Sequence, residues 1–381
     1  MKKIILLLFI FVFTLPVFAS SPYENKNPNL KSELGRVEKV GYEDLEQSFS
    51  EKNQVRQIVN VKLLTGEFKG QTTIIDNMLT NNPYYDIFLK KGDEVILHAE
   101  YENDQSTIDY FITDIHRVGF LNFLFFLFAL LLIIVGRKKG FFSLFSIIAT
   151  ILLIIFVLVP LIRNGFNPII AALFISLLST AITMYSVGGV NKKSTAATLG
   201  TIGSLLVASA LSLLTIKFSR LNGFCCEDTM FLYQVDPGLD FKGILTASMM
   251  LATLGAVMDT SMSIASSINE FFMINPNMKP KDLFLSGMNV GKDIIGTMAN
   301  TLILVYLGGS LPLVLLSQNI DLQKFFNLNH VVTEISSAVI GSISLVICVP
   351  ITAIIAASIV TLNKKEQTKL PFEEEQTYLL K

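Results

Sequence analysis

The residues best suited to chemistry lie in a long apolar segment that begins near Gly243, with Asp259 well inside it. At helical steps of three and four, the same face carries small or polar residues: Ser248, Ala252, Gly255, Ser263, Ser266 and Glu270. A carboxylate deep in a membrane helix costs about 2.5–3.5 kcal/mol on insertion scales, and it normally faces a bundle interior or a water-filled cavity. We therefore expect Asp259 to bind a proton or cation on a solute pathway, with Ser263 beside it.

A second polar stripe begins near Gly287. Its members are Asn289, Asp293, Gly296 or Thr297, and Asn300, followed by Thr301. If the two helices are antiparallel neighbours, Asp293 and Asn300 face Asp259 across one cavity. Simpler alternatives remain open: Asp293 can be a solvated residue at the headgroup level beside Lys292, Asn300 can bond between helices, and Asp259 can be purely structural.

Composition supports a membrane location for these stripes. Hydrophobic residues make up 51% of the chain, charged residues only 16%, and the mean hydropathy is +0.55, unlike an ordinary soluble chain. Segments close to the roughly 20 residues that cross a bilayer lie at 118–135, 141–162, 168–187, 195–215, 243–267, 288–316 and 336–361. The sequence therefore predicts an α-helical membrane bundle of about seven transmembrane helices within 118–362.

The segment ahead of the bundle carries export signals. Residues 1–19 have a basic start, an apolar stretch and a small-residue end, which is typical of a signal peptide; an uncleaved anchor helix is the alternative. Lys and Arg are more frequent in the loops after the first, third, fifth and seventh spans, and such residues are retained in the cytoplasm. We expect residues 20–117 to be extracytoplasmic and the tail, 363–381, to be cytoplasmic.

Residues 20–117 are predicted to form a small β-rich domain. Runs of alternating apolar and polar residues lie at 56–64, 69–75, 94–101 and 107–115. Turn signals at Gly66, Gly70 and Gly92 separate these runs. The pattern favours a five-stranded barrel or small sandwich with a weak resemblance to an OB-fold.

Other chemistry has little support in the residues. The chain contains no H-E-x-x-H, G-x-S-x-G or phosphate-loop pattern, and His98, His116 and His330 lack metal-ligand spacing, so we expect neither a metal nor a cofactor. Cys225 and Cys226 are adjacent and can form a strained disulfide, but free thiols or pairing with another chain fit better. A net charge of −1 argues against nucleic-acid binding.

Several segments together resemble a known family. They are Gly188, Gly189, Lys192, Lys193, Ala196, Gly200, Thr201, the stretch from Leu254 to Glu270, Asn275, Pro276, and the stretch from Ser286 to Pro312. This set resembles the YibE/F-like membrane proteins of bacteria. The resemblance implies a multi-pass plasma-membrane protein with a preceding extracytoplasmic domain, and its motif includes Asp259, Asp293, Asn300 and Thr301. It implies no activity.

The leading functional hypothesis is an ion-coupled transporter or permease whose partners are the lipid bilayer and an unknown small solute or ion. The segment Gly308 to Pro312 is consistent with either close packing or an interrupted helix, as transporters use at binding sites. One alternative is a membrane sensor or assembly subunit that binds a protein partner through its extracytoplasmic domain. An intramembrane enzyme would need Asp259 and Asp293 as an aspartyl pair, but no protease motif surrounds them, so we expect no enzymatic activity.

Overall fold

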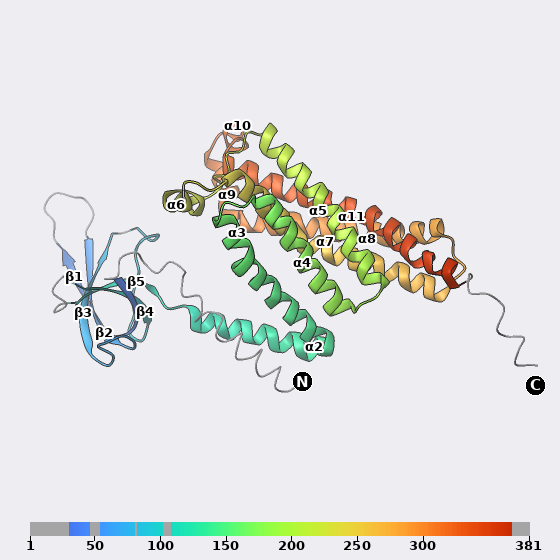
Figure 1. Ribbon diagram of the computed structural model, residues 1–381. Coiled ribbons are helices and arrows are strands. Elements are labelled where there is room, and N and C mark those ends of the chain that lie inside the picture. Colours follow the sequence, from blue (N-terminus) through green and yellow to red (C-terminus); the bar gives the residue numbers. More distant parts are fainter. Residues whose placement is uncertain (1–29, 46–53, 81, 102–107, 368–381) are drawn as a thin grey trace, which may run out of the picture. The chain divides into compact units, whose positions relative to one another are not determined.

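The computed structural model describes residues 30–45, 54–80, 82–101 and 108–367 (Figure 1). The chain divides into two compact units, Met1–Leu131 and Leu132–Lys381, which are described separately below. The predicted signal peptide, 1–19, and all but the beginning of the predicted tail, 363–381, lie outside the described residues. The last helix continues past residue 362, the predicted end of the bundle.

The first unit contains an antiparallel five-stranded sheet that is nearly closed into a barrel, which confirms the expected β-rich domain. Its strands are β1 (Leu30–Leu45), β2 (Gln54–Leu63), β3 (Thr72–Leu79), β4 (Glu94–Tyr101) and β5 (Ile108–Ile115). The spatial order is β3-β2-β1-β4-β5, and the edge strands β3 and β5 approach each other. The longest strand, β1, was not among the four runs recognised in the sequence.

The barrel core follows from strand alternation, because every second residue points inward. Val37, Val59, Val61 and Leu97 are almost fully buried. Glu33 continues the inward row of β1 and is 4% exposed, and its Oε2 atom has no hydrogen-bond partner among the described residues. A buried, unpartnered carboxylate is costly, so this end of the barrel is a weak point of the domain.

The helical elements follow without a further strand in the described residues. They are α2 (Val118–Leu153), the π-helical segment η1 (Ile154–Leu158), α3 (Val159–Arg163), α4 (Pro168–Gly188), α5 (Lys192–Phe218), α6 (Glu227–Val235), α7 (Phe241–Ile274), α8 (Pro280–Gly309), α9 (Leu311–Leu316), the 3₁₀ turn η2 (Ser317–Asn319), α10 (Leu322–Phe325) and α11 (Asn329–Gln367). By length and composition, six described helical segments can cross a membrane.

The difference between these six segments and the seven expected spans lies at Arg137. The first segment, Val118–Arg163, has 46 residues; as one straight helix it would be about 70 Å long, more than twice the thickness of a hydrocarbon core. Arg137 has φ 49° and ψ −126°, which is not helical. This break falls between the spans predicted at 118–135 and 141–162, so the first segment contains both.

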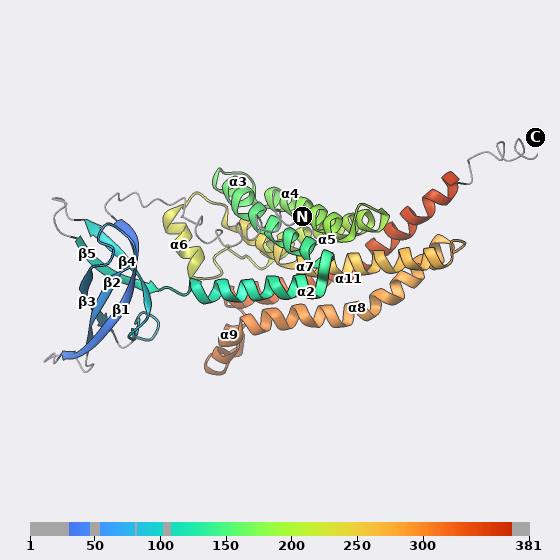
Figure 2. The same cartoon turned by 90° about the horizontal axis from the view of Figure 1, so that it is seen from below.

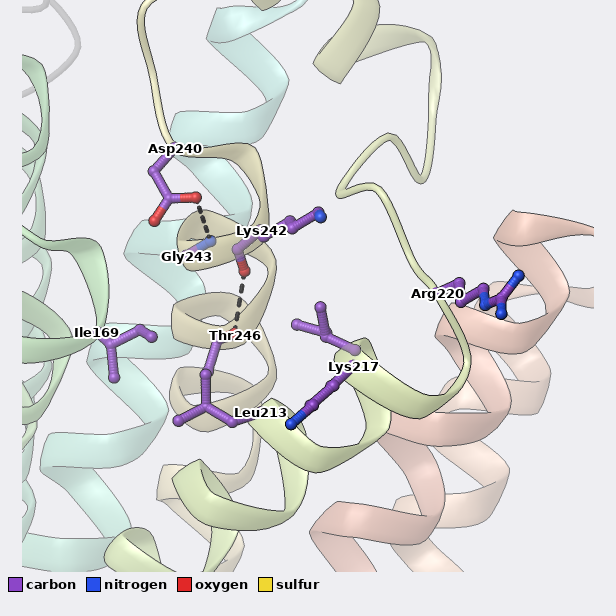
Figure 3. A pocket seen from close by; sticks show the side chains of 9 residues that line it. Ile169, Leu213, Lys217, Arg220, Asp240, Lys242, Gly243 and Thr246 are labelled. Carbon is purple, nitrogen blue, oxygen red and sulfur yellow. Dashed lines mark hydrogen bonds between the residues drawn. The ribbon is translucent and has the colours of Figure 1, made fainter.

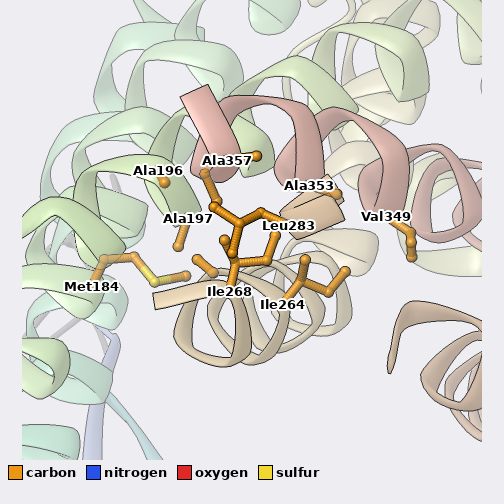
Figure 4. Packing of buried hydrophobic residues seen from close by; sticks show 11 residues of the cluster. Met184, Ala196, Ala197, Ile264, Ile268, Leu283, Val349, Ala353 and Ala357 are labelled. Atoms are coloured by element: carbon orange, nitrogen blue, oxygen red, sulfur yellow. The ribbon is translucent and has the colours of Figure 1, made fainter. Parts of the chain in front are cut away.

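The second unit is held together by close packing of α5, α7, α8 and α11. Figure 4 shows the centre of this packing, where Ala196 and Ala197 of α5, Ile264 and Ile268 of α7, and Ala353 of α11 meet. Small residues let helix backbones approach closely, which is a main source of helix association in membranes. Gly200 of α5 is part of this close packing, since a Cβ there would overlap the side chain of Thr352 on α11.

The basic connections of the second unit lie at one end of the bundle. The α4–α5 turn, the α7–α8 turn and the end of α11 all lie at the right-hand end in both views (Figures 1 and 2). Lys192, Lys279 and Lys364 belong to these connections. Their grouping agrees with the alternation used to predict orientation, while the side of the membrane on which they lie stays a prediction.

Candidate functional site

Asp259 lies near the middle of α7, on the face opposite the bundle core. The helix starts at an N-cap in which Asp240 Oδ1 accepts a hydrogen bond from Gly243 N at 3.0 Å. Its buried face includes Val257, Ser261 and Ile264. The exposed residues at helical spacing on the other face form what we term the Asp259 stripe: Ser248, Ala252, Gly255, Asp259, Ser263 and Glu270. The structure thus keeps Asp259 and Ser263 together, on the surface of the chain.

The predicted residues of α8 are arranged in the same way. This helix buries Leu283, Gly287, Gly291 and Leu302. The predicted small and polar residues are all exposed, and they form what we term the Asn300 stripe: Asn289, Asp293, Gly296, Thr297, Asn300 and Thr301. Thr301 is partly satisfied within its own helix, since its hydroxyl donates to the carbonyl oxygen of Thr297 at 2.9 Å.

The two stripes lie at the same depth along neighbouring helices. Near one end of the pair, Gly287 of α8 packs against Ile268 of α7, and further along, Thr253 and Leu302 both approach Gly341 of α11. From the first contact to the second, α7 goes back by fifteen residues while α8 advances by fifteen. This is expected for antiparallel helices with equal rise per residue. The same relation places Asp259 level with Gly296, one turn from both Asp293 and Asn300.

Depth alone does not bring the two stripes into contact. Across residues 108–367, no hydrogen bond or ion pair is found between a member of the Asp259 stripe and a member of the Asn300 stripe. Gly255 and Gly296, one from each stripe, both have open space where a Cβ would lie. The cavity shared by the two stripes remains a prediction. The contacts between α7 and α8 do not enclose it, so another surface would have to cover the stripes.

A group of hydroxyls and one thiol forms a hydrogen-bond network inside the bundle. The sequence analysis did not predict this network. Ser261 Oγ lies 3.0 Å from Thr201 Oγ1 and 2.8 Å from Cys348 Sγ, and Thr352 Oγ1 donates to it at 3.4 Å. This network joins α5, α7 and α11. Ser261 is two residues from Asp259 and therefore points to nearly the opposite side of α7. Among the described residues, the polar groups buried in the bundle are thus uncharged, and they serve to join helices.

The α8 helix is interrupted within the segment Gly308 to Pro312. It ends at Gly309, and α9 starts at Leu311 with Pro312 in its first turn. In Figure 2, α9 departs from the line of α8. The sequence allowed either close packing or an interrupted helix at this segment, and the structure has the interrupted helix. The helix of the span predicted at 288–316 therefore ends at Gly309.

A pocket of about 650 Å³ lies between the end of α5 and the start of α7. Figure 3 shows Lys217, Arg220 and Lys242 among the residues that line it. In the described part of the chain these three side chains form no ion pair. Asp240 is the one carboxylate in the lining, so the pocket has an excess of positive charge, which disfavours a cation. Neither stripe contributes a residue to the pocket.

Among the described residues, no group of three or more His, Cys, Asp or Glu side chains is arranged to hold a metal ion. Cys225 and Cys226 are half-buried free thiols with their sulfur atoms 3.6 Å apart. Burial, and then the hydrogen bond with Cys226, raise the pKa of the Cys225 thiol to about 11. A neutral thiol is a poor metal ligand.

Comparison with known proteins identifies the family. No curated protein and no solved structure matches the chain. Residues 29–115 match the YibE/F family N-terminal domain, and residues 124–362 match the YibE/F-like protein family. The first match covers the β domain and the second covers the spans that carry both stripes. The chain therefore belongs to the YibE/F-like family, as a multi-pass membrane protein with an N-terminal β barrel.

Proposed function

We propose that this chain is an ion-coupled permease whose solute path runs along the exposed faces of α7 and α8. In this proposal Asp259 binds the coupling proton or cation. Asn289, Asp293 and Asn300 offer hydrogen bonds along the path, and Ser263 and Thr301 lie at its border. The chain itself carries out no covalent chemistry.

The observation that carries the proposal is the location of the charged groups. No carboxylate and no Lys, Arg or His is buried in the described part of the helical unit, where the buried polar residues are Ser and Thr. Asp259 and Asp293 lie instead on helix surfaces inside segments long enough to span a membrane. Contact with lipid there is unfavourable for a carboxylate, so water or another protein surface must cover this face.

A second candidate function uses the same face as a docking surface in a sensor or an assembly. Gly255 and Gly296 have open space beside them, and glycines on a membrane helix allow another helix to approach closely. The polar side chains would then bond to a partner helix, with the N-terminal domain binding a further protein. This function requires no ion movement.

Reconstitution into proteoliposomes separates the two functions. A panel of solutes is applied to proteoliposomes on a solid-supported membrane, and the transient current from charge movement is recorded. A permease gives solute-dependent currents that Asp259→Asn abolishes, because the amide keeps the shape but loses the ionisable group. Glu270→Gln, at the exposed end of the same stripe, is the matched control and should retain them. Solute-dependent currents that persist in Asp259→Asn contradict the proposed role of this carboxylate.

A further inference from the structure

A pocket of about 390 Å³ lies where α8 ends and where α9, α10 and α11 begin. Most of its lining is apolar, with Phe325 at 6% and Ala338 at 8% exposure. The break between α8 and α9 creates this space, because the chain leaves the helix axis at Ser310 and α9 packs beside it as a separate element. None of the residues of the two stripes lines the pocket.

Four polar side chains interrupt the apolar lining: Tyr306 of α8, Glu334 of α11, and the two serines Ser310 and Ser317. The Ser317 hydroxyl already donates to the carbonyl oxygen of Val314 at 2.6 Å. The Tyr306 hydroxyl is buried and has no hydrogen-bond partner in the described residues. A buried polar atom without a partner costs about 1–3 kcal/mol. A bound ligand that forms this hydrogen bond would recover part of that cost.

The charge of the pocket is negative. In the described part of the chain, His330 is the one basic side chain within ion-pair distance of Glu334, with its Nε2 atom 3.9 Å from Oε1, and no Lys or Arg lines the pocket. The C-terminus of α8 and the N-terminus of α11 both lie here, and their partial charges have opposite signs. These helix ends offset each other, so Glu334 determines the sign of the local potential.

Aromatic rings add to the preference for a positive group. Phe325 and Phe326 pack edge to face with ring centroids 5.4 Å apart, and both line the pocket together with Tyr306. An organic cation over an aromatic face is stabilised by the quadrupole of the ring, and this attraction is stronger away from water. The apolar walls, the aromatic faces, the carboxylate and the free hydroxyl therefore all suit one kind of molecule.

We propose that this pocket binds an amphipathic organic cation. The apolar body packs against Phe325 and Ala338, the ammonium group lies beside Glu334, and a polar group of the ligand bonds to the Tyr306 hydroxyl. The same chemistry is offered by a soluble lipophilic amine and by the amine headgroup of a phospholipid. The site does not depend on the permease proposal, because binding can be measured without transport.

The test uses the full chain purified in an uncharged maltoside detergent, with benzyl(2-hydroxyethyl)dimethylammonium as the probe in a calorimetric titration, because the hydroxyl of this cation can bond to Tyr306. We expect saturable binding that Glu334→Gln weakens by about tenfold or more and Tyr306→Phe by about two- to tenfold. Glu334→Asp keeps the charge and should retain most of the affinity. Asp282→Asn, at the other end of α8, should bind as the wild type does.

An uncharged ligand, further variants and a lipid competitor test the individual parts of the proposal. 3,3-Dimethyl-4-phenylbutan-1-ol, the uncharged isostere of the probe, should bind more weakly than the cation and equally well to wild type and Glu334→Gln. If Glu334→Gln does not fold, Tyr306→Phe and the space-filling Ala338→Leu decide the question, and both should weaken binding. Added phosphatidylethanolamine that competes with the probe identifies a lipid headgroup as the natural occupant; no competition identifies a soluble cation. Absence of probe binding, or equal affinity in the wild type and the folded variants, overturns the proposal.

Discussion

The helices α5 and α11 pack closely at Gly200, and replacing this residue with alanine should destabilise the bundle. A Cβ there would overlap Thr352 Oγ1 and would lie 2.9 Å from Thr352 Cβ and 3.1 Å from its Cα. Backbone and β-carbon atoms cannot move aside as a flexible side chain can, so α5 and α11 must separate. Overpacking of this kind costs about 1–3 kcal/mol. The shift would also stretch the hydrogen bond from Thr352 to Ser261.

Gly255→Ala provides the matched control, because this glycine is also inside a helix and has open space beside it. Alanine is favoured over glycine in a helix by about 1 kcal/mol, and both variants share this gain. The difference between their free energies of unfolding therefore isolates the overpacking cost. It can be measured by steric trapping in detergent, and adding Thr352→Ala to Gly200→Ala should restore part of the loss. Equal stability of Gly200→Ala and Gly255→Ala would refute the packing described for α5 and α11.

Three further predictions test other parts of the molecule. In the β domain, Gly66→Ala should lower thermal stability more than Gly92→Ala does: both glycines have positive φ, but only at Gly66 would a Cβ overlap the buried Glu33 carboxylate. Equal losses of thermal stability in the two variants would mean that the contact between position 66 and Glu33 does not affect stability. In a Cys226→Ala, Cys348→Ala background, alkylation of Cys225 by iodoacetamide should be slow at pH 8 and should still rise steeply above pH 9, because burial, the largest cause, raises the pKa of this thiol even without Cys226. A rate that levels off by pH 9 would contradict this. An alkaline phosphatase fusion after Asn319 should be active and one after Lys279 inactive, and the reverse would invert the predicted orientation.

Much of the helical architecture follows from the sequence, because hydropathy and caps act locally. The third span was predicted at 168–187 and is found at Pro168–Gly188, since Asn167 caps the helix and Pro168 occupies its first position. The strand β1 was missed, because Gly35, Gly41 and its many charged residues obscure the alternation. Its buried Glu33 runs against the polar-outward pattern on which strand recognition depends.

The orientation of the polar stripes could not be deduced in the same way. Periodicity places Asp259 and Ser263 on one face of a helix, but it does not say which way that face turns. In a soluble protein the apolar face is the buried one, whereas both lipid and bundle core are apolar in a membrane. Packing at Gly287, against Ile268 of α7, and at Gly291 decides the question, and it directs the opposite faces of α7 and α8 toward the core.

The most direct test of the account asks whether the face containing Asp259 and Asn300 is in contact with water. Single cysteines replace these residues in a chain lacking Cys225, Cys226 and Cys348, and a small water-soluble methanethiosulfonate is applied to the protein in membranes. Cysteines at 259 and 300 should react, whereas cysteines at the buried Val257 and at the exposed apolar Leu304 should not. Unreactive cysteines at both 259 and 300 would mean that lipid or a dry protein contact covers this face, and would contradict a solute path along it.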